Sequence, residues 1–159
     1  MGDKSLVVYY SCTGNTERVA ELIKEGTGSD IFEIELKKDY SLAKAYTVGL
    51  VHASTGYKPK MQDDIDISKY DTIYLGTPVW MFTIAPALRT FIKAHNWEKK
   101  TIFPFCTDEG GKGNCFEKIE ELCKGAAVLE GKEFGFVKNK SDEELKELVT
   151  SWLDDIKEE

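Results

Sequence analysis

Six consecutive residues near the start of the chain have the types that hold an anion. They follow the apolar run Leu6–Tyr10 and precede apolar residues at helical spacing, so they connect a buried strand to the N-terminus of a helix. A helix N-terminus offers unpaired backbone N–H groups, and a glycine allows the backbone to approach an anion closely. The sequence predicts a phosphate site without a basic side chain, although Ser, Thr and Asn could also simply cap the helix. The residues are Ser11, Cys12, Thr13, Gly14, Asn15 and Thr16.

Two other phosphate chemistries fit this loop poorly. Neither G-x-x-x-x-G-K-[ST] nor G-x-G-x-x-G occurs, and the glycine-rich stretch 110–113 has the wrong spacing for both, which disfavours nucleoside triphosphates. Cys12 and Arg18 have the spacing of a tyrosine-phosphatase loop, and a helix N-terminus favours a thiolate. Glu17 stands beside that arginine, where a phosphatase would not place an acid. A phosphatase is therefore a minor alternative.

Two later loops could hold a flat ring. The first follows the strand 72–76 and places aromatic side chains on the solvent side, where they would contact a planar partner. Its candidates are Thr77, Pro78, Val79, Trp80, Met81 and Phe82. The second follows the strand 101–106, and its glycines could let the backbone bond the edge of a ring. Its candidates are Cys106, Thr107, Asp108, Glu109, Gly110 and Gly111. The alternatives are core or interface aromatic residues in the first loop and a solvated mobile segment in the second.

Strands and helices alternate along the chain, which predicts right-handed crossovers and a doubly wound parallel α/β sheet with helices on both faces. Ligands of such sheets bind outside the carboxyl ends of the strands. All three candidate loops begin at the carboxyl ends of expected strands. The expected strands are 6–10, 31–36, 72–76, 101–106 and 133–137, and the expected helices are 16–26, a short one at 42–51, 86–94, 115–124 and one from the capping box of Ser141 and Glu144 to Ile156.

The segment S-x-T-G-N-T after the first strand resembles the phosphate loop of flavodoxins, which carry FMN. The resemblance covers essentially the whole chain and implies a three-layer α/β/α, five-stranded sheet with strand order 2-1-3-4-5. It also implies that Ser11, Thr13 and Thr16 give hydroxyls to the FMN phosphate. Gly14, Asn15 and Thr16 would give backbone N–H groups, and Trp80 would contact the flavin ring.

Two features differ from well-known flavodoxins. No glycine lies between Thr77 and Pro86, although many flavodoxins turn a glycine-containing peptide towards the flavin there, which puts one-electron behaviour in doubt. The third loop lacks the tyrosine that often covers the outer flavin face, and its nearest aromatic residue is Phe116. The acidic residues Asp108 and Glu109 would disfavour a flavin anion.

Composition limits the class of protein. A length of 159 residues is typical of a single domain, here 1–159, and no apolar run approaches a membrane span. A net charge of −7 argues against nucleic acid and favours a basic partner or a small molecule. The four cysteines form no C-x-x-C pair, so a metal site is disfavoured. Without a visible export signal, we expect a cytoplasmic protein with reduced thiols.

These observations lead to three hypotheses of function. The first is an FMN electron carrier between a reductase and an acceptor protein. The second is an FMN enzyme on the same fold that reduces a quinone or a flavin with NAD(P)H, which the missing glycine favours. The third is a binding or regulatory domain without flavin, because fold does not determine function. His52, together with Tyr57 and Lys58, could approach the flavin or a substrate from the segment before the third strand.

Overall fold

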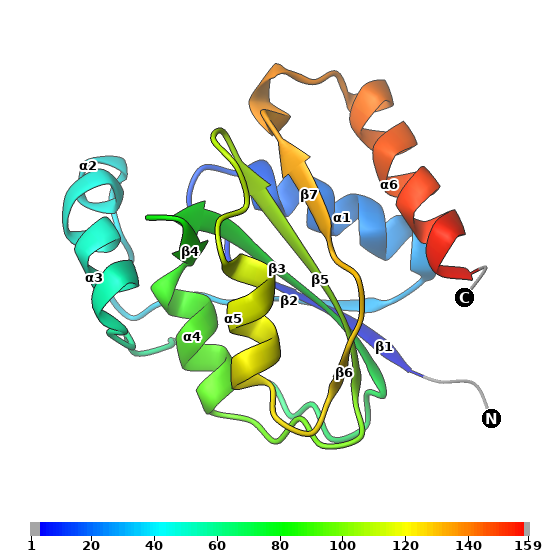
Figure 1. Cartoon of the computed structure of the whole chain (residues 1–159), viewed down its shortest axis with the longest axis horizontal. Coiled ribbons are helices and arrows are strands. Elements are labelled where there is room, and N and C mark those ends of the chain that lie inside the picture. Colours follow the sequence, from blue (N-terminus) through cyan, green and yellow to red (C-terminus); the bar gives the residue numbers. More distant parts are fainter. Residues whose placement is uncertain (1–3, 158–159) are drawn as a thin grey trace.

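The structure is a computed structural model and describes residues 4–157. Its centre is a parallel sheet with the order β2-β1-β3-β5-β6, in which β7 also pairs with β5 (Figure 1). β1, β3 and β5 are almost continuously apolar because helices cover both faces of the sheet. The parallel strands are β1 (Ser5–Tyr9), β2 (Asp30–Glu33), β3 (Thr72–Trp80), β5 (Thr101–Asp108), β6 (Ala127–Val128) and β7 (Lys132–Gly135).

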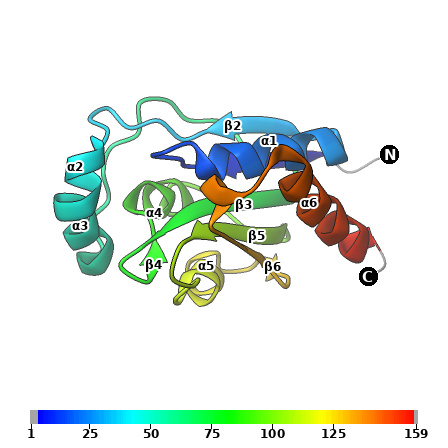
Figure 2. The same ribbon diagram turned by 90° about the horizontal axis from the view of Figure 1, so that it is seen from above.

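Helices pack on both faces of this sheet, as Figure 2 shows from above. α1 (Asn15–Thr27) and α6 (Asp142–Lys157) cover one face, and α4 (Pro86–Lys93) and α5 (Cys115–Leu122) cover the other. Alternate residues of β1 therefore enter different cores: Val7 packs towards α1 and α6, whereas Val8 packs towards α4. The predicted three-layer α/β fold is confirmed. Within residues 4–157, no helix combines the length and apolarity needed to cross a bilayer.

The fifth strand position differs from the prediction. Two short strands, β6 and β7, occupy it instead of the single strand 133–137, and both pair with β5. Between them, Gly131 approaches the β5 backbone so closely that a Cβ would lie 2.6 Å from the Pro104 oxygen. Phe136 adopts a left-handed backbone with φ 51°, which ends β7 before Val137. The predicted order 2-1-3-4-5 is confirmed, with its last position divided.

The third strand is longer than predicted. Instead of ending at Gly76, β3 continues to Trp80 and pairs antiparallel with β4 (Thr83–Ile84). Met81 and Phe82 form the two-residue turn between them, with φ 51° and 61°. Such hairpin turns normally contain Asn-Gly, because glycine adopts positive φ without steric cost. The prediction of a loop over 77–83 was wrong because this turn lacks its usual sequence signal.

This turn predicts a stabilising substitution. Replacing Phe82 with glycine should relieve left-handed strain and raise the melting temperature by about 2–4 °C, equivalent to about 1 kcal/mol at this chain length. Phe82→Ala is the matched control, because it also removes the exposed ring but keeps the Cβ. Thermal unfolding followed by circular dichroism measures the difference. Equal melting temperatures for the two variants would show that the turn is unstrained.

The segment after β2 forms a helical cap beside the β3–β4 hairpin (Figure 1). It contains α2 (Leu42–Lys44), a π-helical turn η1 (Ala45–Gly49) and α3 (Leu50–Thr55), so the predicted helix 42–51 is confirmed but continues to Thr55. Gly49 packs directly against Trp80: a Cβ there would lie 2.9 Å from the indole Cζ3 atom. The absence of a side chain at Gly49 allows this cap to approach the end of β3.

Candidate functional site

A pocket of about 280 Å³ opens at the carboxyl ends of the central strands. Each of the three predicted loops contributes to it, and so do the helical cap and the turn after β7. This is the position where doubly wound sheets bind ligands. Its lining residues are Cys12, Thr13, Asn15, Ala45, Leu50, Pro78, Val79, Trp80, Thr107, Asp108, Glu109 and Val137.

The first loop is organised by Ser11. Its Oγ accepts hydrogen bonds from the backbone N–H of Gly14 at 3.1 Å and of Glu17 at 3.3 Å. Gly14 makes the turn into α1 with a left-handed φ of 95°. The N–H groups of Asn15 and Thr16 also belong to the first turn, where an α-helix provides no internal acceptor. Ser11 thus shapes the loop and leaves first-turn amides for an external acceptor.

The hydroxyl of Thr16 has a different contact from the expected one. Its Oγ1 lies 2.8 Å from Oγ1 of Thr107 at the end of β5, and both residues are buried. This hydrogen bond joins the first loop to the third. Thr13, by contrast, is exposed at the pocket and is the hydroxyl most open to a ligand.

Trp80 lines the pocket but is not a solvent-facing loop residue, so that expectation was wrong. It is the last residue of β3, is 8% exposed, and makes edge contacts with Tyr10 and Tyr40 at centroid distances of 5.8 and 5.2 Å. Met81 and Phe82 are exposed and do not line the pocket. Thr77 is buried below it, where its Oγ1 accepts the backbone N–H of Ala85. The hairpin therefore orients Trp80 inward and Met81 and Phe82 outward.

The third loop gives the pocket an acidic rim. Thr107, Asp108 and Glu109 line it, whereas Cys106 is fully buried and Gly110 and Gly111 lie outside. One Asp108 carboxyl oxygen accepts the backbone N–H of Gly111 at 3.0 Å. A hydrogen bond with Asp108 also raises the pKa of Glu133 above its usual range, with a smaller contribution from burial. The rim thus disfavours additional negative charge.

The phosphatase alternative does not fit the geometry. Burial, helped by the charge of Asp39, raises the pKa of the Cys12 thiol, so this cysteine is not an activated thiolate. Its sulfur instead lies 3.8 Å from the Tyr40 carbonyl oxygen. Arg18 forms its hydrogen bonds with the turn between β7 and α6, away from an anion held by the loop.

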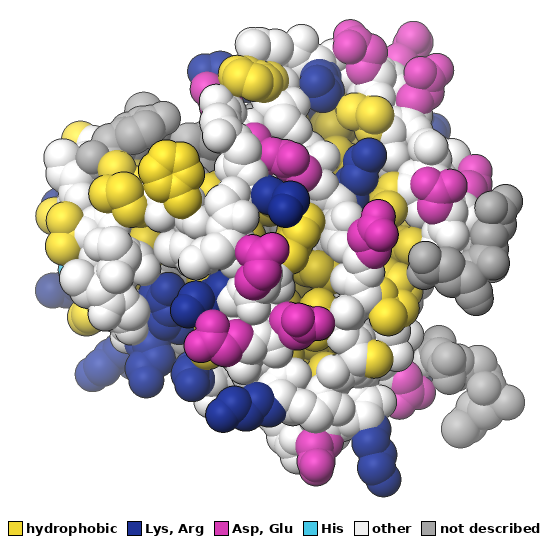
Figure 3. Space-filling view, in the orientation of Figure 1, with side chains coloured by type: hydrophobic (Ala, Val, Ile, Leu, Met, Phe, Trp, Pro, Cys, Tyr) yellow, Lys and Arg dark blue, Asp and Glu magenta, His cyan; other side chains and the backbone are white. Residues whose placement is uncertain are grey.

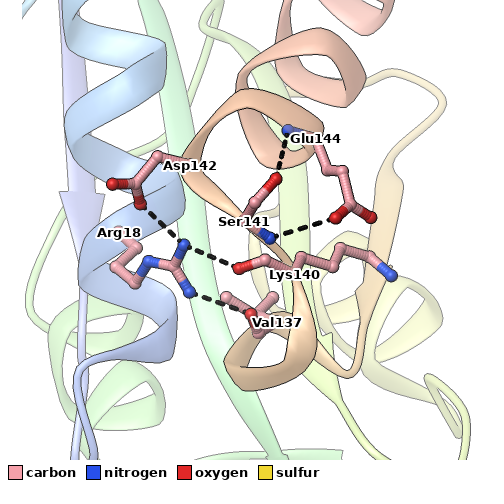
Figure 4. A network of polar contacts seen from close by, with 6 residues as sticks. All are labelled: Arg18, Val137, Lys140, Ser141, Asp142 and Glu144. Carbon is pink, nitrogen blue, oxygen red and sulfur yellow. Dashed lines mark hydrogen bonds and ion pairs between the residues drawn. The ribbon is translucent and has the colours of Figure 1, made fainter.

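Arg18 fixes one wall of the pocket (Figure 4). Its guanidinium donates to the carbonyl oxygens of Val137 at 2.9 Å and Lys140 at 3.2 Å, and it pairs with Asp142 at 2.9 Å. Next to it, the predicted capping box is confirmed: Ser141 Oγ accepts the N–H of Glu144, whose carboxylate accepts the N–H of Ser141. Together these contacts hold Val137 beside α1 at the pocket wall.

Replacing Arg18 with methionine should therefore weaken ligand binding from outside the pocket. The variant loses two hydrogen bonds to carbonyl oxygens but retains much of the aliphatic packing of the side chain, so we expect a loss of about 1–3 kcal/mol in stability. Ligand affinity should fall several-fold because Val137 is released. Asp142→Asn, which removes only the exposed ion pair, is the control and should have little effect. Urea unfolding and ligand titration measure both quantities, and equal behaviour of the two variants would contradict this role.

Three wall residues were not among the predicted site residues. Ala45 and Leu50 come from the helical cap, and Val137 follows β7. Small apolar residues in helices usually belong to a core, so their types carry no binding signal. His52 does not line the pocket; its Nδ1 lies 2.7 Å from the Tyr40 hydroxyl, and its ring stacks near Tyr57. His52 therefore acts on the pocket indirectly, because it contacts Tyr40, which packs on Trp80.

Two curated relatives share the name NAD(P)H dehydrogenase (quinone), and both are longer than this chain. An NAD(P)H dehydrogenase (quinone) of Cupriavidus metallidurans is 28% identical over 89 residues, which cover 56% of this chain and 45% of that protein. One of Acidithiobacillus ferrooxidans is 30% identical over 88 residues, 55% of this chain and 44% of that protein. The chain thus matches less than half the length of these relatives.

Solved structures and a family comparison agree with the fold. A candidate flavoprotein from Bacteroides uniformis superposes with a TM-score of 0.80 at 27% identity over 97% of this chain and 99% of its own. A flavoprotein from Lactobacillus acidophilus, solved in complex with FMN, gives a TM-score of 0.69 at 26% identity over 83% and 93%. The sequence profile of the flavodoxin family matches residues 4–156. This chain belongs to the flavodoxin family.

Proposed function

We propose that this protein binds one FMN in the pocket at the carboxyl ends of β1, β3 and β5 and transfers electrons between redox partner proteins. The observation that carries the proposal is the combination of an uncharged phosphate cradle at α1 with a pocket beside it that has one apolar wall and one acidic rim. FMN supplies the redox chemistry, and the chain supplies binding and electrostatics.

The residues present fit FMN. At the phosphate end, first-turn amides and the exposed Thr13 offer donors, and a Cβ built on Gly14 would meet nothing within 4 Å, so there is room for an anion. Beside it, Trp80, Leu50 and Val137 offer apolar surface for a planar ring. Asp108 and Glu109 at the rim would lower the reduction potential by disfavouring an anionic reduced flavin.

The negative net charge of the protein supports the electron-carrier hypothesis. A net charge of −7 favours encounter with basic protein partners, and no proton-transfer residue is required for electron transfer. We place the protein in the cytoplasm as one domain, 1–159, where its four free cysteines would stay reduced.

A second candidate function is reduction of a quinone or flavin by NAD(P)H. The NAD(P)H dehydrogenase (quinone) relatives favour it. So does the Met81–Phe82 turn, which lacks the glycine peptide associated with one-electron chemistry. Stepwise reduction of the loaded protein separates the two functions. Two distinct one-electron steps without NADPH turnover support a carrier, and oxidation of NADPH in the presence of a quinone supports an enzyme.

FMN binding is tested by titrating the purified protein with FMN and following flavin fluorescence. We expect a 1:1 complex, and Thr13→Val should weaken it about tenfold or more, since a hydrogen bond to a charged group contributes about 1.5–3 kcal/mol. Thr150→Val, an exposed substitution on α6, is the control and should leave the affinity unchanged. Absence of FMN binding would overturn the proposal, and an unaltered affinity of Thr13→Val would overturn the phosphate assignment.

A further inference from the structure

A second pocket, of about 440 Å³, lies on the other side of the helical cap. α3 separates the two pockets: Leu50 lines the first, and Ala53 to Gly56 line the second. Met81 and Thr83 of the β3–β4 hairpin line it as well. The remaining lining residues are Arg89 of α4, Asn114, and Lys118 of α5, so the described lining contains two cations and no carboxylate.

Arg89 is an unusual residue for such a position. It is only 8% exposed, and its Nη2 donates to the Ala53 carbonyl oxygen at 3.2 Å. Its Nη1 is buried without a hydrogen-bond partner in the part of the chain that the structure describes, and no carboxylate of that part pairs with the guanidinium. Thr83, 7% exposed, has a buried Oγ1 that also lacks a partner there.

The unpartnered Nη1 of Arg89 and Oγ1 of Thr83 are energetically unfavourable when no ligand is bound. Buried polar groups are almost always hydrogen-bonded, and a buried charge needs a counter-charge. Burial accordingly lowers the pKa of Arg89, because desolvation disfavours its charged form. A small anion entering from the pocket would supply both the missing charge and the missing acceptors.

The surroundings also favour an anion. Within residues 4–157, the only ion pair of Lys118 is with Glu121, at 3.2 Å on the same helix. Exposed pairs of this kind are weak, so the Lys118 ammonium can turn to a ligand. Figure 3 shows Lys and Arg side chains gathered on the side of α3 and α4, although the whole protein is acidic. A local basic area of this kind would attract an anion to the pocket.

We propose that this second pocket binds the carboxylate or phosphate group of a small anionic molecule, with Arg89 as the principal partner and Thr83 and Lys118 as further donors. The unpartnered Nη1 of the guanidinium can donate charge-assisted hydrogen bonds to either group. The proposal does not depend on FMN, because none of these three residues lines the first pocket.

The test is thermal unfolding of the FMN-saturated full chain, or of the protein alone if FMN does not bind, in sodium phosphate, sodium malonate or sodium chloride of equal ionic strength. We expect phosphate or malonate to raise the melting temperature by about 2–4 °C over chloride, as a ligand of the folded state does. A response to phosphate alone identifies a phosphate ligand, and a response to malonate alone identifies a carboxylate.

Variants locate the effect. Arg89→Met keeps the aliphatic length and should abolish the anion-dependent shift, whereas Thr13→Val in the first pocket should retain it. If Arg89→Met does not fold, Lys118→Gln and Thr83→Val carry the test, and each should at least halve the shift. The proposal is overturned if chloride acts as strongly as the other anions, or if the shift persists in these pocket variants. Arg89 is then a structural residue whose free nitrogen meets only water.

Discussion

Replacing Gly113 with alanine is expected to lower the free energy of unfolding by about 3 kcal/mol or more. Gly113 has a left-handed φ of 54°, which costs an alanine about 1–2 kcal/mol. In addition, a Cβ there would overlap the carbonyl group of Phe82, which is backbone and cannot move aside as a side chain can. That carbonyl oxygen accepts the N–H of Asn114 at 2.8 Å, so the clash falls on the contact that joins the hairpin to the third loop.

The neighbouring Gly110→Ala provides a matched control. Gly110 lies in the same loop without positive φ, and a Cβ there would meet nothing within 4 Å, so its stability should change by no more than about 0.5 kcal/mol. Urea unfolding of both variants measures the difference. We also expect weaker FMN binding in Gly113→Ala, because the displaced hairpin carries Trp80. Similar stabilities of the two variants would show that the hairpin and the loop do not depend on this contact.

The elements that the sequence predicted correctly carry strong local signals. Continuous apolar runs mark β1 and β5, which are buried on both faces. The loop from Ser11 to Thr16 combines anion-binding residue types with a position between a strand and a helix. The structure brings several of its residues to a pocket at the expected edge of the sheet. The capping box depends only on Ser141 and Glu144, which lie in the same helical turn, so the local sequence is enough to predict it.

The elements that differ depend on contacts between distant segments. Trp80 looks like an exposed loop residue in the sequence because nothing nearby shows that Tyr10 and Tyr40 will pack against it. The turn of Met81 and Phe82 adopts positive φ without glycine or asparagine, so no turn signal marks it. Backbone of this kind concentrates near functional sites, and here the turn follows Trp80, which lines the first pocket, and includes Met81, which lines the second.

The hydrogen bond between Thr16 and Thr107 should be the strongest single link between the phosphate loop and the third loop. Replacing Thr16 with valine leaves the Thr107 hydroxyl buried without this partner, and such an orphaned group costs about 1–3 kcal/mol. FMN affinity should fall as well, because the first turn of α1 is then released from β5. Urea unfolding and FMN titration measure the two effects.

A double-mutant cycle separates the two roles of Thr16. In Thr16→Val combined with Thr107→Val, both partners become apolar groups of similar shape, so stability should return to within about 1 kcal/mol of the wild type. If the Thr16 hydroxyl also reaches the FMN phosphate, the double variant stays about tenfold weaker in FMN binding even though its stability is restored. If affinity returns together with stability, Thr16 acts only by fixing the loop, and the cradle consists of Ser11, Thr13 and backbone amides. Thr16→Val alone is expected to be less stable than the wild type, because it leaves the Thr107 hydroxyl buried without its partner. If Thr16→Val is as stable as the wild type, the hydrogen bond between Thr16 and Thr107 contributes nothing to stability.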